Sequence, residues 1–408
     1  MKMPLVPTYV LVALLGFYCW KYGLKPAWTG IHSDFPNYYV SARVILAGED
    51  RALLYDDTWF QTKIHEAGIE EQGKFSSFPP CTAFVMLPLA PFAPQTAKRL
   101  WTSFNLAMVA VCCLLLVRLT GWRAHSCLLL LLGCGMGLTN TFRLGQFYLV
   151  LTAMIMGAWL LQQHKFYRWA GILLGMAVSL KYMPVVFLLP LLPRKRVVVG
   201  VALATVCCIT LIEVLVYGPH AWWGFFTTTF LPHLDGTIVN QGGYAHAFQS
   251  FNSFYRNLFL QDAIANPHPF LDLPLAYAIA KWATLALIGG VTVFFYRRLC
   301  HPDQRFALIG VTTMLVLPAS ATYHFLLLVP PLALLGRDLQ RQGQERILIV
   351  LVAIFAGIGF MPYWRFKALP LFFQYPRLWA MLLLWLLVLW VCCEFSTSGE
   401  HRNNDHLT

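Results

Sequence analysis

The residues best suited to chemistry lie in the stretch IHSDFPNYY, residues 31–39, where Asp34 stands among aromatic side chains. A carboxylate at the mouth of a membrane cavity, walled by aromatic rings, is partly desolvated. Its pKa then rises towards the range in which it can accept a proton from a reacting group. Two other interpretations remain open for Asp34: a solvated loop acid, or the N-cap of a helix over residues 38–47.

Acidic residues are concentrated around Asp34. Eight carboxylates and four basic side chains lie between Gly30 and Phe78, whereas the whole chain of 408 residues holds 18 acids and has a net charge of +12. A loop of roughly 50 residues that does not cross a membrane is unusual and tends to be functional. We therefore expect the rest of the chain to form a membrane frame around this loop.

Cationic side chains in or near apolar segments form a second group of candidates, because a charge within a span is costly and is a functional hypothesis by default. The candidates are Arg143, Lys181, Arg256, His324 and Arg365. Each also has a structural interpretation. Lys181 could extend its ammonium to the cytoplasmic membrane surface, Arg143 could be a plain cytoplasmic anchor, and His324 could hydrogen-bond a helix end.

Other polar and aromatic groups give weaker signals. Glu213 is a further acid, near the end of an apolar run. The tryptophans and phenylalanines at 222–226 are more typical of an interfacial belt than of a platform that stacks against a ligand. Asp56 and Asp57 are adjacent, unlike the D-x-D pair that grips a metal-bound nucleotide, so no metal site is expected there.

The composition is that of a polytopic helical membrane protein. Hydrophobic residues make up 58% of the chain, charged residues 12%, and the mean hydropathy is +0.60; soluble domains carry about twice that charged fraction. The first apolar run lacks a cleavage site and is expected to be retained. The basic residues flank apolar runs, which argues against nucleic-acid binding, and the 11 cysteines are expected to be small apolar helix residues.

Apolar runs predict about twelve transmembrane helices in a single domain over residues 1–393. The runs are residues 5–20, 80–91, 100–119, 126–141, 147–161, 169–192, 197–217, 274–296, 306–319, 323–335, 347–361 and 378–393. Several are shorter than the usual span of about 20 residues, and the run over 169–192 is expected to be broken near Lys181 and Pro184. They leave two long extracytoplasmic loops, at about 25–79 and 218–273, and a polar cytoplasmic tail, 394–408, expected to be disordered.

Basic clusters orient these helices. With the N-terminus inside, Lys98–Arg99 and residues 194–196, 297–305 and 337–346 fall in the cytoplasm, and both long loops lie outside. Four cations are then misplaced on the outer side: Arg118, Arg123, Lys165 and Arg168. Either a short span is miscounted, or these cations bind lipid phosphates at the outer interface.

Short motifs recur in one order along most of the chain. They are D-F-x-x-Y-Y at 34–39, Ala47-Gly48, Leu54-Tyr55-Asp56, F-P-P…L-P-L at 78–89, L-W…N-L at 100–106, R-x-G-Q at 143–146, G-x-x-x-G…K at 171–181, Q-S-x…R at 249–256 and L-P…Y-H at 317–324. Each is weak alone. Their combined order resembles glycosyltransferase family 87, a polyprenol-phosphate-dependent branch of the GT-C superfamily, although Phe78 replaces the tyrosine common there.

The resemblance implies a GT-C-type helical bundle in the cell membrane that transfers a sugar, often mannose, from a polyprenyl-phosphate donor to a lipid or glycan acceptor. Transfer would occur on the extracytoplasmic face with inversion. Asp34 would be the general base and His324 a second catalytic residue. The implied substrate-binding residues are Tyr38, Tyr39, Arg143, Gln146, Lys181, Gln249 and Arg256.

A lipid-phosphate donor agrees with the lack of a GxGxxG or P-loop motif in the sequence. The expected partners are membrane lipids, the donor and the acceptor, with no nucleic acid, no cofactor and no metal ligands. A lipid-linked glycan flippase or secondary transporter stays open as an alternative, as does a GT-C-like pseudoenzyme that acts as an assembly subunit. Transporters are often built from repeated halves, and no second copy of HSDFPNYY or LGQFY is present.

Overall fold

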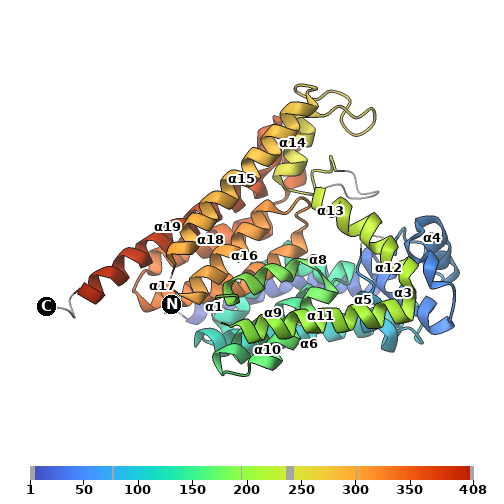
Figure 1. Ribbon diagram of the computed structural model, residues 1–408, viewed down its shortest axis with the longest axis horizontal. Coiled ribbons are helices and arrows are strands. Elements are labelled where there is room, and N and C mark those ends of the chain that lie inside the picture. The colour runs from blue at the N-terminus through green and yellow to red at the C-terminus, as the bar shows by residue number, and fades with distance from the viewer. Residues whose placement is uncertain (1–4, 76–77, 194, 236–242, 300, 405–408) are drawn as a thin grey trace. The chain divides into compact units, whose positions relative to one another are not determined.

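The computed structural model describes residues 5–75, 78–193, 195–235, 243–299 and 301–404. Regular structure in these residues is helical, apart from an isolated bridge between Asp262 and Asn266. The predicted all-α fold is therefore confirmed. The chain divides into two compact units, residues 2–239 and 240–408, and each is described by itself (Figure 1).

Several helices have the length and composition of membrane spans. Four qualify by themselves: α6 (Pro94–Thr120), α11 (Arg196–Tyr217), α15 (Pro274–Arg298) and the Pro376–Glu394 part of α19 (Pro376–Asn404). A fifth span results if α7 (Ala124–Gly133) and α8 (Met136–Leu144), bent by 76° at their junction, cross together. The protein is thus a multi-pass membrane protein, and the total of about twelve spans stays a prediction.

The first unit also contains many shorter elements. They are α1 (Leu5–Cys19), η1 (Trp20–Leu24), α2 (Lys25–Thr29), α3 (Asp34–Ala47), η2 (Arg51–Tyr55), α4 (Asp57–Glu66), α5 (Cys81–Met86), η4 (Leu87–Leu89), α9 (Tyr148–Gln163), α10 (Tyr167–Leu180), η5 (Met183–Leu191), α12 (Pro219–Phe225), η6 (Phe226–Phe230) and α13 (Leu231–Asp235). Helices η1 and η6 are π-helical turns, which continue α1 into α2 and α12 into α13.

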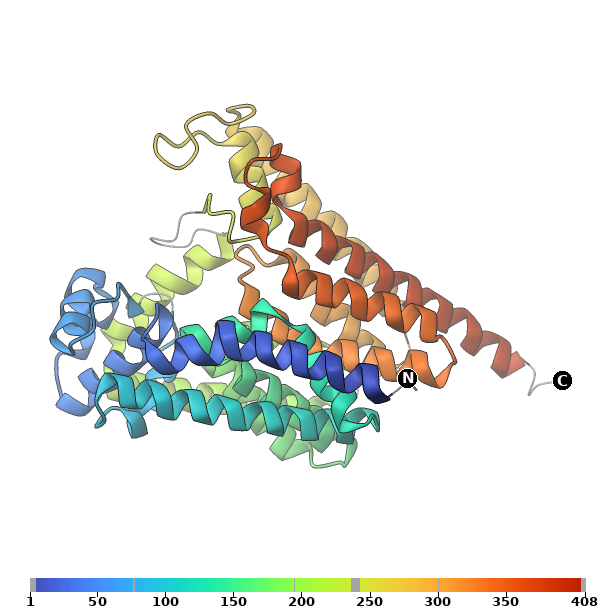
Figure 2. The same cartoon turned by 180° about the vertical axis from the view of Figure 1, so that it is seen from behind.

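Helix α6 connects the two ends of the first unit. Its first turns lie beside α2, because the side chains of Gln95 and Arg99 donate hydrogen bonds to the Trp28 carbonyl at 2.8 and 3.1 Å. Its 27 residues then extend about 40 Å. We call the end that carries α3, α4 and α12 the Asp34 end, and Figures 1 and 2 show it far from the N-terminus, at the other extreme of this unit.

Helices α10 and α11 run between the same two ends. At one end, Lys195 Nζ donates a hydrogen bond to Tyr167 Oη at 2.8 Å. At the other, Tyr217 Oη donates to the Pro80 carbonyl at 2.9 Å. The two helices pack closely at Gly175, where a Cβ atom would lie 2.6 Å from the Ala202 carbonyl oxygen. A glycine is therefore required at this position.

The predicted span over residues 80–91 is not a membrane-crossing helix. Its two short elements, α5 and η4, hold six and three residues, too few for a hydrocarbon layer of about 30 Å. Prolines at 80, 88 and 91 lack the N–H that a continuous helix needs. The predicted break of the 169–192 run near Lys181 and Pro184 is confirmed, because α10 ends at Leu180 and a separate 3₁₀ segment, η5, begins at Met183.

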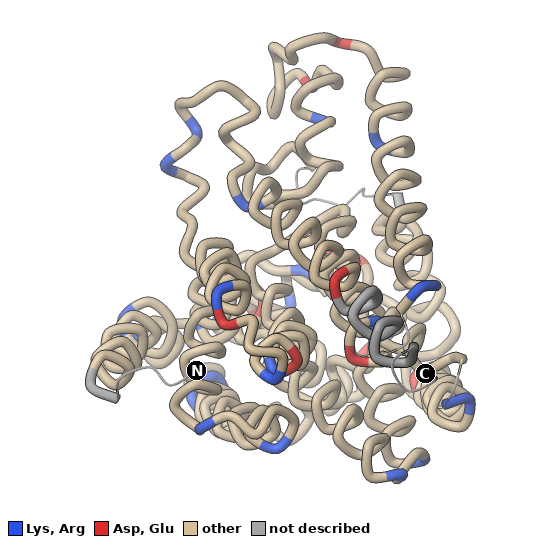
Figure 3. The backbone as a smooth tube through the Cα atoms, turned by 90° about the vertical axis from the view of Figure 1, so that its left-hand side faces the viewer, with Lys and Arg blue, Asp and Glu red and all other residues tan. Residues whose placement is uncertain are grey.

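This correction moves the basic residues. Because residues 80–91 do not cross the membrane, Lys98 and Arg99 lie at the same end as Asp34. Their predicted place on the opposite side is therefore wrong. Arg118, in the last turn of α6, lies at the end of the unit opposite to Asp34, which we call the far end. Near this end α6 contacts the start of α7, where the Ala124 carbonyl is 3.4 Å from Cys113 Sγ. Figure 3, viewed from the left-hand side of Figure 1, shows Lys and Arg at many helix ends and turns.

The second unit is built from α14 (Phe251–Phe259), α15, α16 (Pro302–Val316), η7 (Thr322–Leu328), α17 (Val329–Arg341), α18 (Glu345–Phe360), η8 (Tyr363–Phe366), η9 (Leu371–Gln374) and α19. Buried polar groups join three of its helices: Trp385 Nε1 of α19 donates to Thr312 Oγ1 of α16 at 3.1 Å, and Thr292 of α15 bonds the same hydroxyl at 3.1 Å. Helix α19 continues to Asn404, within the segment predicted to be a disordered tail.

Candidate functional site

Asp34 is the first residue of α3, and its buried carboxylate accepts a hydrogen bond from a residue that is distant in the sequence. Gln146 Nε2 donates a hydrogen bond to Asp34 Oδ2 at 2.5 Å, and Tyr38 Oη donates to Gln146 Oε1 at 2.9 Å. Only 9% of Asp34 is exposed. The preceding residue, Ser33, has the N-cap position and a φ of 36°, so Asp34 is not the cap of this helix.

Gln146 reaches Asp34 because of the turn between α8 and α9. Gly145 ends α8 in the left-handed conformation, with a φ of 73°. A Cβ atom on Gly145 would lie 2.9 Å from Phe35 Cβ, so glycine is required for both conformation and space. The R-x-G-Q motif thus forms a turn that presents its glutamine to the candidate base.

Two lysines place positive charge near the carboxylate. Lys181, just beyond α10, has its Nζ 4.3 Å from the centre of the Phe78 ring and 5.7 Å from that of Tyr38. Lys98 in α6 is fully buried, with its Nζ 5.0 Å from the centre of the Phe35 ring. Sequence analysis identified Lys181 but assigned Lys98 to a cytoplasmic cluster. A lysine at the start of an apolar helix, three residues before Trp101, was the available signal.

Burial and charge act in opposite directions on Asp34. Burial raises the pKa of the carboxyl above its usual range, while the hydrogen bond from Gln146 and the charges of Lys181 and Lys98 lower it; the net shift is upward. Asp34 can therefore accept a proton more readily than a solvated aspartate. His32, two residues earlier, has its pKa lowered by burial and by the nearby Arg143.

An open polar hollow lies beside this segment. It has a volume of about 680 Å³, and it is lined by Ile31, residues 68–72 and Gln95. Glu71, one of two carboxylates in the lining, lies 3.6 Å from His32 Nδ1. The lining has no lysine or arginine, so an uncharged polar ligand fits it better than an anion.

Two other predicted binding residues have mainly structural surroundings. Tyr39 is fully buried, and its hydroxyl donates a hydrogen bond to the Phe92 carbonyl at 2.6 Å. Arg143 has an exposed side chain, while its backbone carbonyl accepts a hydrogen bond from Lys98. The first unit therefore brings together Asp34, Tyr38, Gln146 and Lys181, with Tyr39 and Arg143 at the periphery.

Glu213 is a buried carboxylate at the Asp34 end of α11. Trp222 Nε1 in α12 donates a hydrogen bond to Glu213 Oε2 at 3.1 Å. This bond attaches α12 to α11, which gives the acid a structural function.

The remaining predicted site residues belong to the second unit. Gln249 is buried and its amide bonds three backbone groups: Nε2 donates to the His246 and Gln374 carbonyls, and Oε1 accepts from the Arg377 N–H. Arg256 is half-buried, with its guanidinium 5.5 Å from the centre of the Tyr277 ring. Arg365 in η8 is exposed.

His324 lies in the first turn of η7 and bonds the start of that helix. Its Nδ1 accepts a hydrogen bond from the Ala321 N–H at 3.0 Å. In the neutral ring the proton is then on Nε2, which makes that atom a donor. The helix-end interpretation of His324 fits this contact, and a donor at Nε2 is compatible with a second function.

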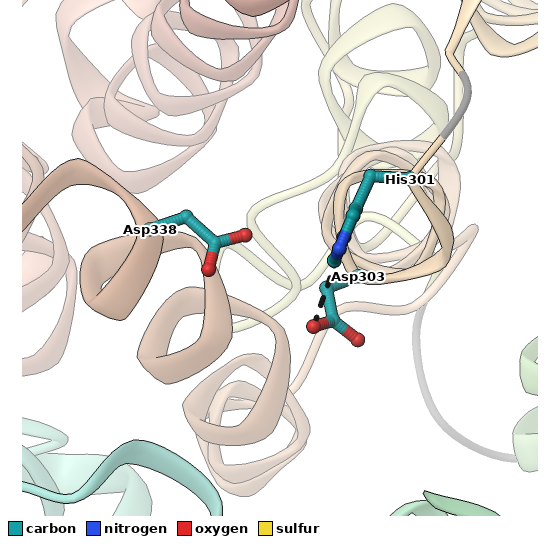
Figure 4. Close-up of side chains that lie close together, drawn as sticks. All are labelled: His301, Asp303 and Asp338. Carbon is teal, nitrogen blue, oxygen red and sulfur yellow. Dashed lines mark ion pairs between the residues drawn. The ribbon is translucent and has the colours of Figure 1, made fainter. Parts of the chain in front are cut away.

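A separate group of potential cation ligands, His301, Asp303 and Asp338, lies in the second unit (Figure 4). Arg337 already bonds both carboxylates, with its Nη2 2.5 Å from Asp303 Oδ2 and 2.8 Å from Asp338 Oδ1. The guanidinium thus supplies the positive charge that these acids need, and the cluster joins α16 to α17.

Comparison with known proteins gives one match. Residues 77–318 match the family model described as Glycosyltransferase family 87. The matched region contains Lys98, Gln146 and Lys181, whereas Asp34 and His324 lie outside it. No curated protein and no solved structure matches the chain.

Proposed function

We propose that this chain, which belongs to glycosyltransferase family 87, transfers a sugar from a polyprenyl-phosphate donor to a hydroxyl of a lipid or glycan acceptor. The family makes the chain a glycosyltransferase, and its apolar helices make it a membrane enzyme. The donor, its sugar (mannose in our proposal), the acceptor and the inverting course are the proposed part. The observation that carries the mechanism is the buried Asp34 carboxylate, bonded by Gln146 and flanked by two lysines.

Asp34 would act as the general base. The acceptor hydroxyl gives its proton to the Asp34 carboxylate while its oxygen attacks the anomeric carbon of the donor sugar. The bond between that carbon and the phosphate oxygen breaks, and the bonding electrons leave with the polyprenyl phosphate. Asp34 then releases the proton to water. A base matched to this task needs a raised pKa, which burial provides.

Positive charge would stabilise the departing phosphate. Lys181 is the first candidate, because its ammonium lies over aromatic rings of the Asp34 cluster and its side chain is partly exposed. Arg256 and Gln249 as substrate-binding residues, and His324 as a second catalytic residue, stay proposals that rest on the order of motifs in the sequence. Within the second unit, Gln249 holds the backbone at His246 and Gln374.

The reaction would take place outside the cytoplasm. In the first unit, basic residues near the end of α6 and the starts of α10 and α11 lie away from Asp34. By the positive-inside rule, these residues support an outer position for the Asp34 end.

Transfer of label tests the proposal. Purified protein in lipid vesicles should convert polyprenyl-phosphate [³H]mannose and a crude lipid-glycan acceptor fraction into a labelled glycoside. Movement of label across the bilayer without a new glycosidic bond would instead identify a transporter. Neither product nor transport with any polyprenyl-phosphate hexose would contradict both assignments.

A further inference from the structure

Lys98 is the most deeply buried cation at the Asp34 end. Lys98 belongs to the first turns of α6, and its side chain is fully buried. Its Nζ donates hydrogen bonds to the carbonyls of Phe142 and Arg143, both at 3.0 Å. These carbonyls are in the last turn of α8. A cation in that position is stabilised by the negative end of the helix dipole.

Trp101 bonds the same turn from the same face of α6. Trp101 lies three positions after Lys98, so the two side chains share one face of the helix. Trp101 Nε1 donates a hydrogen bond to the Gly145 carbonyl at 2.8 Å. Together the two side chains hold three carbonyls within residues 142–145.

The turn held in this way is the one that presents Gln146 to Asp34. The ideal Cβ position at Gly145 is 3.0 Å from Lys98 Nζ, so the ammonium is packed directly against the turn. The next residue, Gln146, donates its hydrogen bond to Asp34. A shift of Lys98 or Trp101 would therefore move the amide that orients the carboxylate.

We propose that Lys98 and Trp101 form a positioning clamp, which holds the Gly145–Gln146 turn against Asp34 and lets Lys98 stabilise the ionised carboxylate. The proposal rests on the proposed function of Asp34 as base. Lys98 acts through the turn and through its charge, and it does not contact the substrate. A purely structural cap would need only a neutral donor, whereas Lys98 also interacts electrostatically with the Asp34 carboxylate.

The charge environment of Asp34 defines the test. Lys98 on α6 and Lys181 after α10 act on the carboxylate, and Gln146 and Ser33 bond it. His32 stands two residues away with Glu71 and Arg143 near it. Removing one of the lysine charges should leave ionised Asp34 less stable, so the acidic limb of the rate profile should move to higher pH.

Lys98→Met, which keeps the length of the side chain, removes the charge and both hydrogen bonds. We expect kcat to fall and the acidic limb of kcat/KM to move up by about one pH unit or more, the shift that loss of a nearby opposite charge produces. Trp101→Phe should lower kcat without moving the limb. Arg99→Met is the matched control, because Arg99 is the exposed neighbouring cation that bonds Trp28; its profile should equal that of the wild type.

An infrared measurement of the Asp34 carboxyl separates this inference from the proposed function, because it needs no turnover. The band of the protonated acid, identified by its loss in Asp34→Asn, should persist to higher pH in Lys98→Met than in Arg99→Met. Equal titration in the two folded variants would overturn the inference even if the enzyme is active. A shifted titration in a protein that transfers no sugar would support the clamp and refute the function.

Discussion

Lys181 places its ammonium over the rings of Phe78 and Tyr38, at the rim of the Asp34 cluster. If it binds the donor phosphate, Lys181→Met should reduce kcat/KM for the donor by roughly 30–1000-fold, the equivalent of about 2–4 kcal/mol of transition-state stabilisation. The KM for the acceptor should change little. Steady-state kinetics with each substrate varied in turn measures the two effects.

Lys195→Met is the matched control for this experiment, since Lys195 lies against Tyr167 at the far end of the unit. Normal donor kinetics in Lys181→Met would remove Lys181 from the site. An equal loss in both lysine variants would indicate a general effect on the protein.

At the residue scale, sequence reasoning identified Asp34, its aromatic neighbours and Lys181, but it missed Lys98. Asp34 stood out because it lies among aromatic residues in an acidic loop. Its partner Gln146 is 112 positions away, and only the resemblance to a family suggested that residue. Lys98 was misassigned because charge bias alone cannot distinguish a cytoplasmic anchor from a buried cation beside a buried acid.

The packing of α10 on α11 depends on glycines. Ideal Cβ atoms at Gly171 and Gly175 would lie 2.7 and 2.6 Å from the carbonyl oxygens of Val198 and Ala202. Small residues allow such close approach between membrane helices. Because Lys181 follows α10 directly, this contact also determines the place of its ammonium.

Gly175→Leu should therefore force α10 away from α11 and destabilise the protein by about 1–3 kcal/mol, as overpacking does. Its thermal unfolding in detergent should begin at a lower temperature than that of the wild type. Gly200→Leu is the control, because a Cβ atom at Gly200 meets nothing within 4 Å. Equal unfolding temperatures for the two variants would show that the contact does not constrain the helices.

At the element scale, sequence reasoning located the apolar segments and predicted the break of the 169–192 segment near Lys181 and Pro184. It counted residues 80–91 as a short span, which the structure divides into α5 and η4. The prolines of both segments, including Pro88 and Pro184, fall where helical hydrogen bonding stops or becomes 3₁₀. A sum of side-chain hydropathies contains no information about the backbone N–H that a proline lacks.

For the molecule as a whole, the division of residues 80–91 changes the proposed topology. Thr96, at the start of α6, should share the outer side with Gln72, whereas Arg123 should face the cytoplasm. The sequence-based scheme placed α6 in the reverse direction. The revised direction would put Arg118, Arg123, Lys165 and Arg168 on the inner side, and would put Lys98 and Arg99 on the outer side with Asp34.

Single cysteines at these three exposed positions test the topology in a variant whose native cysteines are replaced. A membrane-impermeant maleimide should label the cysteines at positions 72 and 96 in intact cells. It should label the cysteine at position 123 only after permeabilisation. Labelling of positions 96 and 123 in the opposite pattern would restore the original direction of α6.

The central claim is that Asp34 is the base, and the transfer rate of Asp34→Asn tests it most directly. Asparagine keeps the size and part of the hydrogen bonding but cannot accept a proton at neutral pH. The variant should insert and bind the donor normally, yet lose transfer by roughly 10²–10⁴-fold. Asp50→Asn is the control, because Asp50 only caps η2 by accepting the Ala52 N–H, a function that asparagine retains. Wild-type transfer by Asp34→Asn, at matched expression and with an active Asp50→Asn, would contradict the account.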